Sequence, residues 1–125
     1  MSPEQEIETI ISGVHPQCGH WPYEKDADIY VGWRVGEESF EPAGNRPTRV
    51  SLIYDVAIVH AYELTAEAEQ LRYRLYEALR AKGWRLSGPP GPEATMQAHR
   101  QRMWPFSVVK GFAIRGGVPQ TEGIT

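Results

Sequence analysis

The stretch RVSLIYDVAIVHA, residues 49–61, decides the fold of this chain. It carries β-branched residues on both of its faces, which is typical of a β-strand. One face is a continuous apolar row formed by Val50, Leu52, Tyr54, Val56 and Ile58. Asp55 and His60 are the polar interruptions. Because a strand that is apolar on both faces is buried on both, this stretch predicts the central strand of a sheet, or a strand that a neighbouring molecule covers.

A helix follows this strand closely. The segment LTAEAEQLRYRLYEALRAKGW, residues 64–84, has an apolar stripe at helical spacing, formed by Ala68, Leu71, Leu75, Ala78 and Leu79. Thr65 is a residue type that caps the start of a helix. Gly83 is suited to end it, because glycine accepts the left-handed conformation found after many helices. The segment therefore predicts an amphipathic helix.

Further elements lie on both sides of this pair. Ser2, Pro3 and Gln5 indicate the start of a first helix, in which Ser2 and Gln5 complete a capping box. Apolar and polar residues alternate in residues 29–35 and again within residues 104–116, so both segments predict strands.

The intervening segments are rich in turn formers. Residues 36–47 predict a mobile connection between two strands. The prolines within residues 88–92 exclude a helix there, with room for a brief strand just before them at residues 84–86.

The order of elements is thus helix, strand, strand, helix, short strand and final strand. Short connections between neighbouring strands favour antiparallel pairing. The sequence predicts an α+β fold, with a mainly antiparallel sheet and two helices packed on one face. We expect a single domain at residues 1–115 and a flexible tail at residues 116–125. The second face of the sheet has no predicted cover.

Composition and charge exclude several classes of protein. The 125 residues suffice for one domain with its own core, without disulfides or metal. One cysteine cannot form an internal disulfide, and no charged and then apolar leader precedes the first helix, so we expect a cytosolic protein.

The apolar runs are far shorter than the roughly 20 residues of a membrane span. The net charge of −3 gives no overall attraction to nucleic acid phosphates. We expect no membrane partner and no sequence-specific nucleic acid partner.

The stretch HPQCGHW, residues 15–21, raises the question of a metal site. The possible soft ligands in the chain are His15, Cys18, His20, His60 and His99. Structural zinc sites join one pair of closely spaced ligands to a second pair that the fold brings in. Only the first half of that pattern is present, so a polar loop without metal is the favoured interpretation.

Catalytic patterns are also incomplete. Cys18 with His20 or His60 would offer a nucleophile and a base, but no glycine-rich oxyanion turn brackets the cysteine. The acidic group within residues 24–28 lacks the regular loop and distal glutamate of a calcium hand. No phosphate loop, dinucleotide turn or hydrolase elbow occurs in the sequence. We expect no catalytic, cofactor-binding or metal-binding residue, no cofactor and no enzymatic activity.

The aromatic residues exceed what one small core needs. Tyr73 and Tyr76 lie off the leucine stripe of the long helix, and protein interfaces favour large aromatics and arginine. The alternative is that these residues are scattered over the surface. Residues 99–104, HRQRMW, could also contact nucleic acid locally, because arginine beside tryptophan suits base stacking. The interface candidates are Phe40, Arg46, Tyr73, Tyr76, Arg100, Arg102 and Trp104.

The layout resembles that of a known family. The succession consists of a short first helix, the strands DIYVGW and RVSLIYDVAIVHAY, the helix TAEAEQLRYRLYEALRAKGW and the closing segment RQRMWPFSVVKGFAI. It resembles the tail terminator and tail completion proteins of long-tailed bacteriophages and gene transfer agents. The resemblance covers about residues 5–115 as a pattern of elements, and the passage from the long strand into AEAEQLRYRLYEAL is its most telling part.

The resemblance implies a structural virion subunit that forms a ring, usually a hexamer, on the last ring of the tail tube. Such a ring stops tube polymerisation and joins the tube to the head connector, with room for DNA to pass through it. The implied partners are further copies of the chain, the tail tube protein and the head-tail connector protein. The implied location is the tail-neck junction of a virion assembled in the bacterial cytoplasm. A head-tail joining (neck) subunit of the same virion and a non-viral protein-binding adaptor domain are the alternatives.

Overall fold

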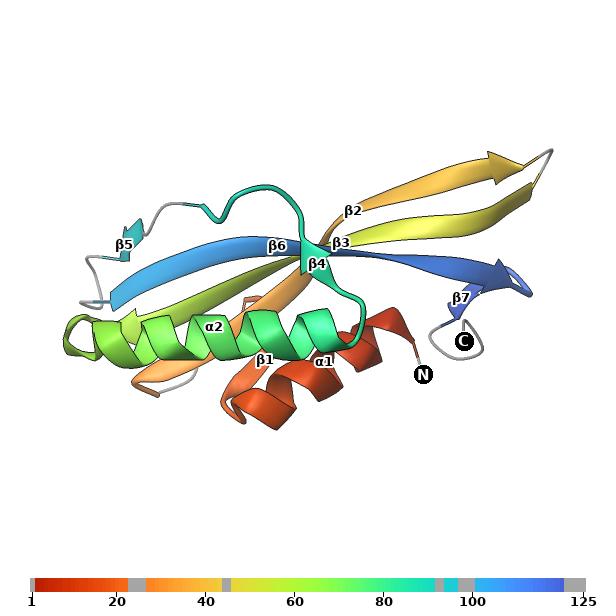
Figure 1. Cartoon of the computed structure of the whole chain (residues 1–125). Helices are drawn as coiled ribbons and strands as arrows, with labels where there is room; N and C mark the ends of the chain where they lie inside the picture. The colour runs from red at the N-terminus through yellow and green to blue at the C-terminus, as the bar shows by residue number, and fades with distance from the viewer. Residues whose placement is uncertain (1, 23–26, 44–45, 92–93, 97–100, 121–125) are drawn as a thin grey trace.

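Residues 2–22, 27–43, 46–91, 94–96 and 101–120 are described by the structure, a computed structural model of the chain (Figure 1). In this part of the chain the α-helices and strands are, in order, α1 (Pro3–Val14), β1 (Cys18–His20), β2 (Ile29–Ala43), β3 (Arg46–Ala61), α2 (Thr65–Ala81), β4 (Arg85–Leu86), β5 (Ala94–Met96), β6 (Gln101–Arg115) and β7 (Val118–Gln120). A short 3₁₀ turn, η1 (Tyr62–Leu64), precedes α2.

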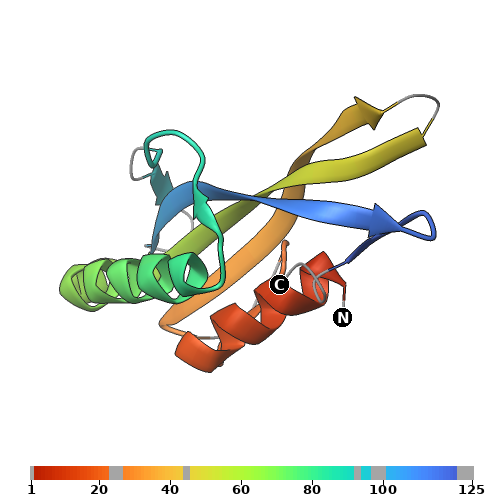
Figure 2. The same cartoon turned by 45° about the vertical axis from the view of Figure 1, so that its right-hand side comes forward.

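The strands lie in one sheet with the order β1-β2-β3-β6-β4, and β5 and β7 also pair with β6. The pairing of β1 with β2 is parallel. The remaining pairings of the described strands are antiparallel. Both helices lie on the same face of the sheet (Figures 1 and 2). These observations confirm the predicted α+β fold with a mainly antiparallel sheet and two helices on one face.

Strand β3 is the centre of this sheet, as predicted. It pairs with β2 along one edge and with β6 along the other. The predicted apolar row from Val50 to Ile58 faces the core, and none of its five side chains is more than 5% exposed. Phe106, Val108 and Phe112 of β6 lie opposite this row and are also buried.

The two helices cover this apolar row. The buried stripe of α2 consists of Ala68, Leu71, Leu75 and Leu79, and α1 adds Ile7 and Ile11. The predicted capping box of α1 is present, because the Gln5 amide donates to Ser2 Oγ at 3.2 Å and the Ser2 amide donates to Gln5 Oε1 at 2.8 Å. Among the described helices, neither combines the length and the apolar character that crossing a membrane requires.

The predicted cap of α2 is wrong, whereas its predicted end is confirmed. Leu64 occupies the N-cap position, and Thr65 lies within the first turn. The Thr65 hydroxyl donates to the Tyr62 carbonyl at 3.0 Å, because the η1 turn brings that carbonyl within reach. Gly83 ends the helix with φ of +89°, a conformation that glycine adopts without a Cβ clash.

The predicted mobile connection at residues 36–47 is instead largely strand. β2 continues to Ala43 and β3 begins at Arg46, and Phe40 lies opposite Val50 in the ladder. Turn-forming residues extend a strand here because β6 already holds residues 49–53 of β3 in register, which offers β2 a ready partner. A β-bulge between Val35 and Glu37 interrupts the ladder.

Three shorter segments also pair. Cys18–His20 is within the predicted loop, but it pairs in parallel with β2 and so forms the short strand β1. The brief strand expected near residues 84–86 is present as β4. Within the predicted tail, Gly116 and Gly117 take positive φ and turn Val118–Gln120 back onto β6. The rest of that tail, residues 121–125, lies outside the described residues.

The second face of the sheet is partly covered by two segments. The Trp21 ring lies on β2 at Gly32, where an added Cβ would come within 2.5 Å of the ring. From the opposite side, the segment after β4 arches over β6 (Figure 1). It is held there by hydrogen bonds from Ser87 N to Ser107 O at 2.8 Å and from Gly91 N to Pro105 O at 3.0 Å.

A polar contact lies inside the core. Glu6 of α1 is 9% exposed, and its Oε1 accepts hydrogen bonds from Lys110 Nζ at 2.5 Å and from Trp84 Nε1 at 3.0 Å. The Trp84 ring in turn packs edge-on to Tyr54 and tilted against Phe112. The carboxylate therefore joins α1, the end of α2 and β6 at one point, and it depends on both donors for its burial.

Lys110→Met is expected to lower the free energy of unfolding by about 3 kcal/mol, because it leaves the Glu6 carboxylate buried without its cation. The double variant Glu6→Met with Lys110→Met removes both charges, so it is expected to recover much of that loss. Urea unfolding followed by tryptophan fluorescence measures both values. Equal stabilities of the wild type and Lys110→Met would contradict this role of the ion pair.

Candidate interaction surfaces

The possible metal ligands lie in separate contacts. His15 Nε2 is 2.9 Å from the Ile29 carbonyl, and His20 Nε2 is 3.5 Å from Glu4 Oε1. His60 is buried on β3, with Nδ1 2.7 Å from the Ala61 carbonyl. Within the described ranges, no group of three His, Cys, Asp or Glu side chains is placed to hold a metal ion. His99 and residues 24–26 lie outside those ranges.

Cys18 lies in β1 opposite Val31 and is partly buried. Burial raises the pKa of its thiol, and the negative charge of Glu8 raises it further. Both effects disfavour the thiolate, which is the nucleophilic form of cysteine. The surroundings of Cys18 therefore oppose the activation that a catalytic cysteine requires.

Arginine and aromatic side chains gather where α2 meets the first half of β6. We call this group the arginine-aromatic cluster, and it consists of Tyr62, Arg72, Tyr73, Tyr76, Arg102 and Trp104. Arg72 Cζ lies 4.1 Å from the centroid of the Trp104 ring and 5.1 Å from that of Tyr73. Arg102 Cζ lies 5.1 Å from the centroid of Tyr62. Both guanidinium groups are thus placed for cation–π contacts.

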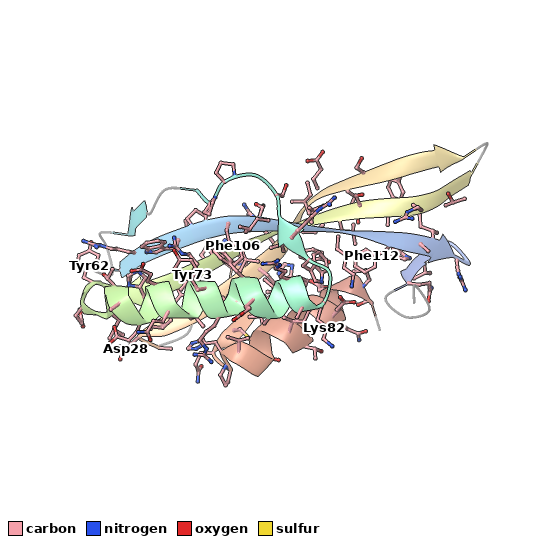
Figure 3. All side chains as sticks on the ribbon, in the orientation of Figure 1. Asp28, Tyr62, Tyr73, Lys82, Phe106 and Phe112 are labelled. Atoms are coloured by element: carbon pink, nitrogen blue, oxygen red, sulfur yellow. The ribbon has the colours of Figure 1, made fainter. Side chains whose placement is uncertain are left out.

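The cluster rests on the core through Tyr76. The Tyr76 ring packs edge-on to Phe106 at 4.8 Å and to Tyr73 at 5.9 Å between centroids. Burial is the main cause of the raised pKa of the Tyr76 hydroxyl. Tyr73, by contrast, is 57% exposed. Figure 3 shows Tyr73 on α2 beside β6, with Tyr62 at the left of the view, where the helix begins.

Several polar atoms of this cluster are buried without a hydrogen-bond partner among the described residues. They are Arg72 Nε, Tyr76 Oη and Trp104 Nε1. Such atoms are uncommon in native proteins. Trp33 Nε1 and His60 Nε2 are in the same state outside the cluster. Close packing of rings and guanidinium groups accounts for the three atoms of the cluster.

A second candidate surface lies at the other end of the sheet. We call the outer part of the β2–β3 hairpin, from Val35 to Val50, the hairpin arm. In Figure 1 it projects beyond both helices. Phe40 is 53% exposed on it and Val35 is 46% exposed. Glu37 and Glu38 are exposed between these two residues. Arg49 is also exposed near the base of the arm. The described side chains of the arm are thus apolar, acidic and, at Arg49, basic.

The structure brings four of the seven interface candidates together, namely Tyr73, Tyr76, Arg102 and Trp104. Phe40 lies apart on the hairpin arm. Arg46 begins β3 opposite Ala43, and its side chain lies outside the described part. Arg100 also lies outside it. The role of all seven in an interface stays a prediction.

Sequence reasoning missed Arg72 and Tyr62. Arg72 and Tyr76 are four residues apart on one helix, a spacing at which side chains meet. That signal was present in the sequence. Tyr62 gave no such signal, because its contact with Arg102 depends on the pairing of β3 with β6.

A groove of about 420 Å³ occupies the second face of the sheet, between Trp21 and the segment at Pro89 and Gly91. Its floor holds Asp55, whose Oδ1 accepts a hydrogen bond from Ser107 Oγ at 2.7 Å and whose Oδ2 lies 3.9 Å from Arg34 Nε. Apolar walls with a polar floor are typical of a small ligand or peptide site.

No protein-family model and no curated protein sequence matches the chain significantly. The function is therefore inferred from the two surfaces and the groove.

Alkylation of Cys18 by iodoacetamide is expected to be slower in the folded protein than in urea-unfolded protein at neutral pH, because the raised pKa lowers the thiolate fraction. The rate should rise to its plateau at a higher pH in the folded protein. Mass spectrometry of quenched samples measures both profiles, and Cys18→Ser gives the background. A folded protein that reacts faster than the unfolded one would contradict this assignment.

Proposed function

We propose that the chain is a structural subunit that associates with copies of itself into a ring, as the resemblance to tail terminator proteins implies. The observation that carries the proposal is the hairpin arm. A strand pair that leaves the body of the fold and exposes Phe40 and Val35 keeps apolar surface in water, which is unfavourable unless a partner covers it.

The distribution of the two surfaces supports a ring. The hairpin arm and the arginine-aromatic cluster lie at opposite ends of β3 and differ in composition. Contacts between unlike surfaces are heterologous, and they generate a closed ring when the rotation between copies completes a circle. A two-fold dimer built on one self-complementary patch would need only one of these surfaces.

In this proposal the ring binds the end of a tail tube, stops the addition of further tube subunits and presents its other side to the head connector. A neck subunit that joins head and tail would need the same type of ring. The two roles differ only in which protein the ring binds first, so binding to purified tube ends is what separates them.

A protein-binding adaptor is the second candidate, and the groove beneath Trp21 favours it. The groove is large enough for a few side chains of a peptide, and Asp55 and Arg34 offer charges of both signs at its floor. An adaptor of this kind would act as a monomer and would not need the hairpin arm.

Light scattering coupled to size exclusion over a concentration series tests the proposal. We expect species several times heavier than the 14.1 kDa chain, with rings visible by negative-stain microscopy. A monomer at every concentration would contradict the proposal and favour the adaptor.

A shortened arm is the matching variant. Replacing residues 41–49 by Asn-Gly joins Phe40 to its ladder partner Val50 through a turn that suits two-residue hairpins. The variant moves Phe40 from the extended strand to the edge of the new turn. We expect a folded chain that keeps its helical circular dichroism signal and a loss of the heavy species. Phe40→Ala tests the same surface without changing the backbone.

A further inference from the structure

The hairpin arm carries one aromatic side chain in acidic surroundings. Phe40 and Glu38 lie opposite Val50 and Leu52, so both are on the face of the sheet that carries the helices. Glu38 is exposed, whereas Glu37, opposite Ile53, lies on the other face. Glu4 of α1 lines the same hollow as Trp33 of β2, close to the start of the arm. Burial, with the charges of Glu4 and Glu38, raises the pKa of Tyr54 to about 12. The described carboxylates give this end of the face a negative potential.

The arginine-aromatic cluster has the complementary chemistry. Arg72 is stacked on Trp104 and next to Tyr73, whose exposed ring offers an apolar surface. A guanidinium stacked on a ring keeps N–H groups at its edge, and these suit carboxylates. Arg102 of the same cluster is stacked on Tyr62 and has interactions of its own, so Arg72 is the guanidinium that a neighbouring carboxylate would meet. The cluster therefore suits a segment that presents an aromatic ring beside a carboxylate.

The two surfaces of one copy cannot meet. Val50 lies beside Phe40 and Ile58 lies beside Trp104 in the ladders. These two positions of β3 are eight residues apart, or roughly 27 Å at the usual rise of a strand. β3 is held extended between β2 and β6 over this distance, so the arm does not fold back onto the cluster. Any contact between them joins two copies.

We propose that the hairpin arm of one copy docks on the arginine-aromatic cluster of the next copy. Phe40 packs against the exposed ring of Tyr73, and the carboxylate of Glu38, on the same face of the arm, pairs with the guanidinium group of Arg72. This inference rests on the proposed ring, and it names the two surfaces that the ring contact joins. Repetition of one such contact leaves each copy with one arm and one cluster engaged.

Exchange of charges between the two surfaces tests this pairing. Phe40→Lys places a cation against the arginines, and Tyr73→Glu places an anion against the acidic arm. Both positions are more than half exposed, so both variants are expected to fold. Each is expected to weaken self-association at least tenfold, measured as the dissociation constant in sedimentation velocity. Leu86→Lys, at an exposed apolar position on β4, is the matched control and is expected to leave association unchanged.

The double variant Phe40→Lys with Tyr73→Glu tests whether the two positions contact each other across copies or weaken association separately. Every contact in it would place the introduced lysine of one copy against the introduced glutamate of the next, so association should recover relative to both single variants. A double variant that is weaker than either single variant would overturn the pairing and leave the ring intact. Single variants that associate like the wild type would also overturn the pairing and leave the ring intact. A monomeric wild-type chain would overturn the proposed ring itself, and the pairing with it.

Discussion

Strand β3 has to satisfy its backbone on both edges and bury side chains on both faces, and the rest of the fold follows from this constraint. β2 and β6 complete its two ladders. The helices cover its apolar row, and Val59 on the opposite face is fully buried. The Glu6 carboxylate then fixes α1 to this core through Trp84 and Lys110. The two donors on one carboxylate thus tie α1 both to the residue after α2 and to β6.

Those parts of the fold that depend on neighbours in sequence were predictable. The capping box of α1, the leucine stripe of α2 and the apolar row of β3 are local patterns, and each is present. The composition of residues 36–47 favours turns, whereas their strand conformation depends on pairing with a strand already held by β6, so the local sequence predicts the wrong structure there. The same reason applies to β1 and β7, which are short and exist only against β2 and β6.

The candidate site was predictable in its residue types more than in its arrangement. Tyr73, Tyr76, Arg102 and Trp104 were selected because they are large aromatics or arginine, and the register of β3 and β6 places them together. Phe40 lies on a different surface, because it belongs to the β2–β3 hairpin at the other end of β3. The ligands suggested by residues 15–21 were close in sequence only, since β1 and the end of α1 hold His15 and His20 in different contacts.

The two edges of the sheet are protected unequally. Along β6, the outer edge is occupied by β5, the segment after β4, β4 itself and β7. Along β2, only the stretch opposite β1 is paired on its outer side in the described residues. The strands at the β6 side, β4, β5 and β7, are only two or three residues long, so they present few unpaired backbone groups to another sheet. Backbone pairing between copies would therefore start on the open stretch of β2, and the short strands at the other edge hinder the repeated edge-to-edge addition that builds a fibre.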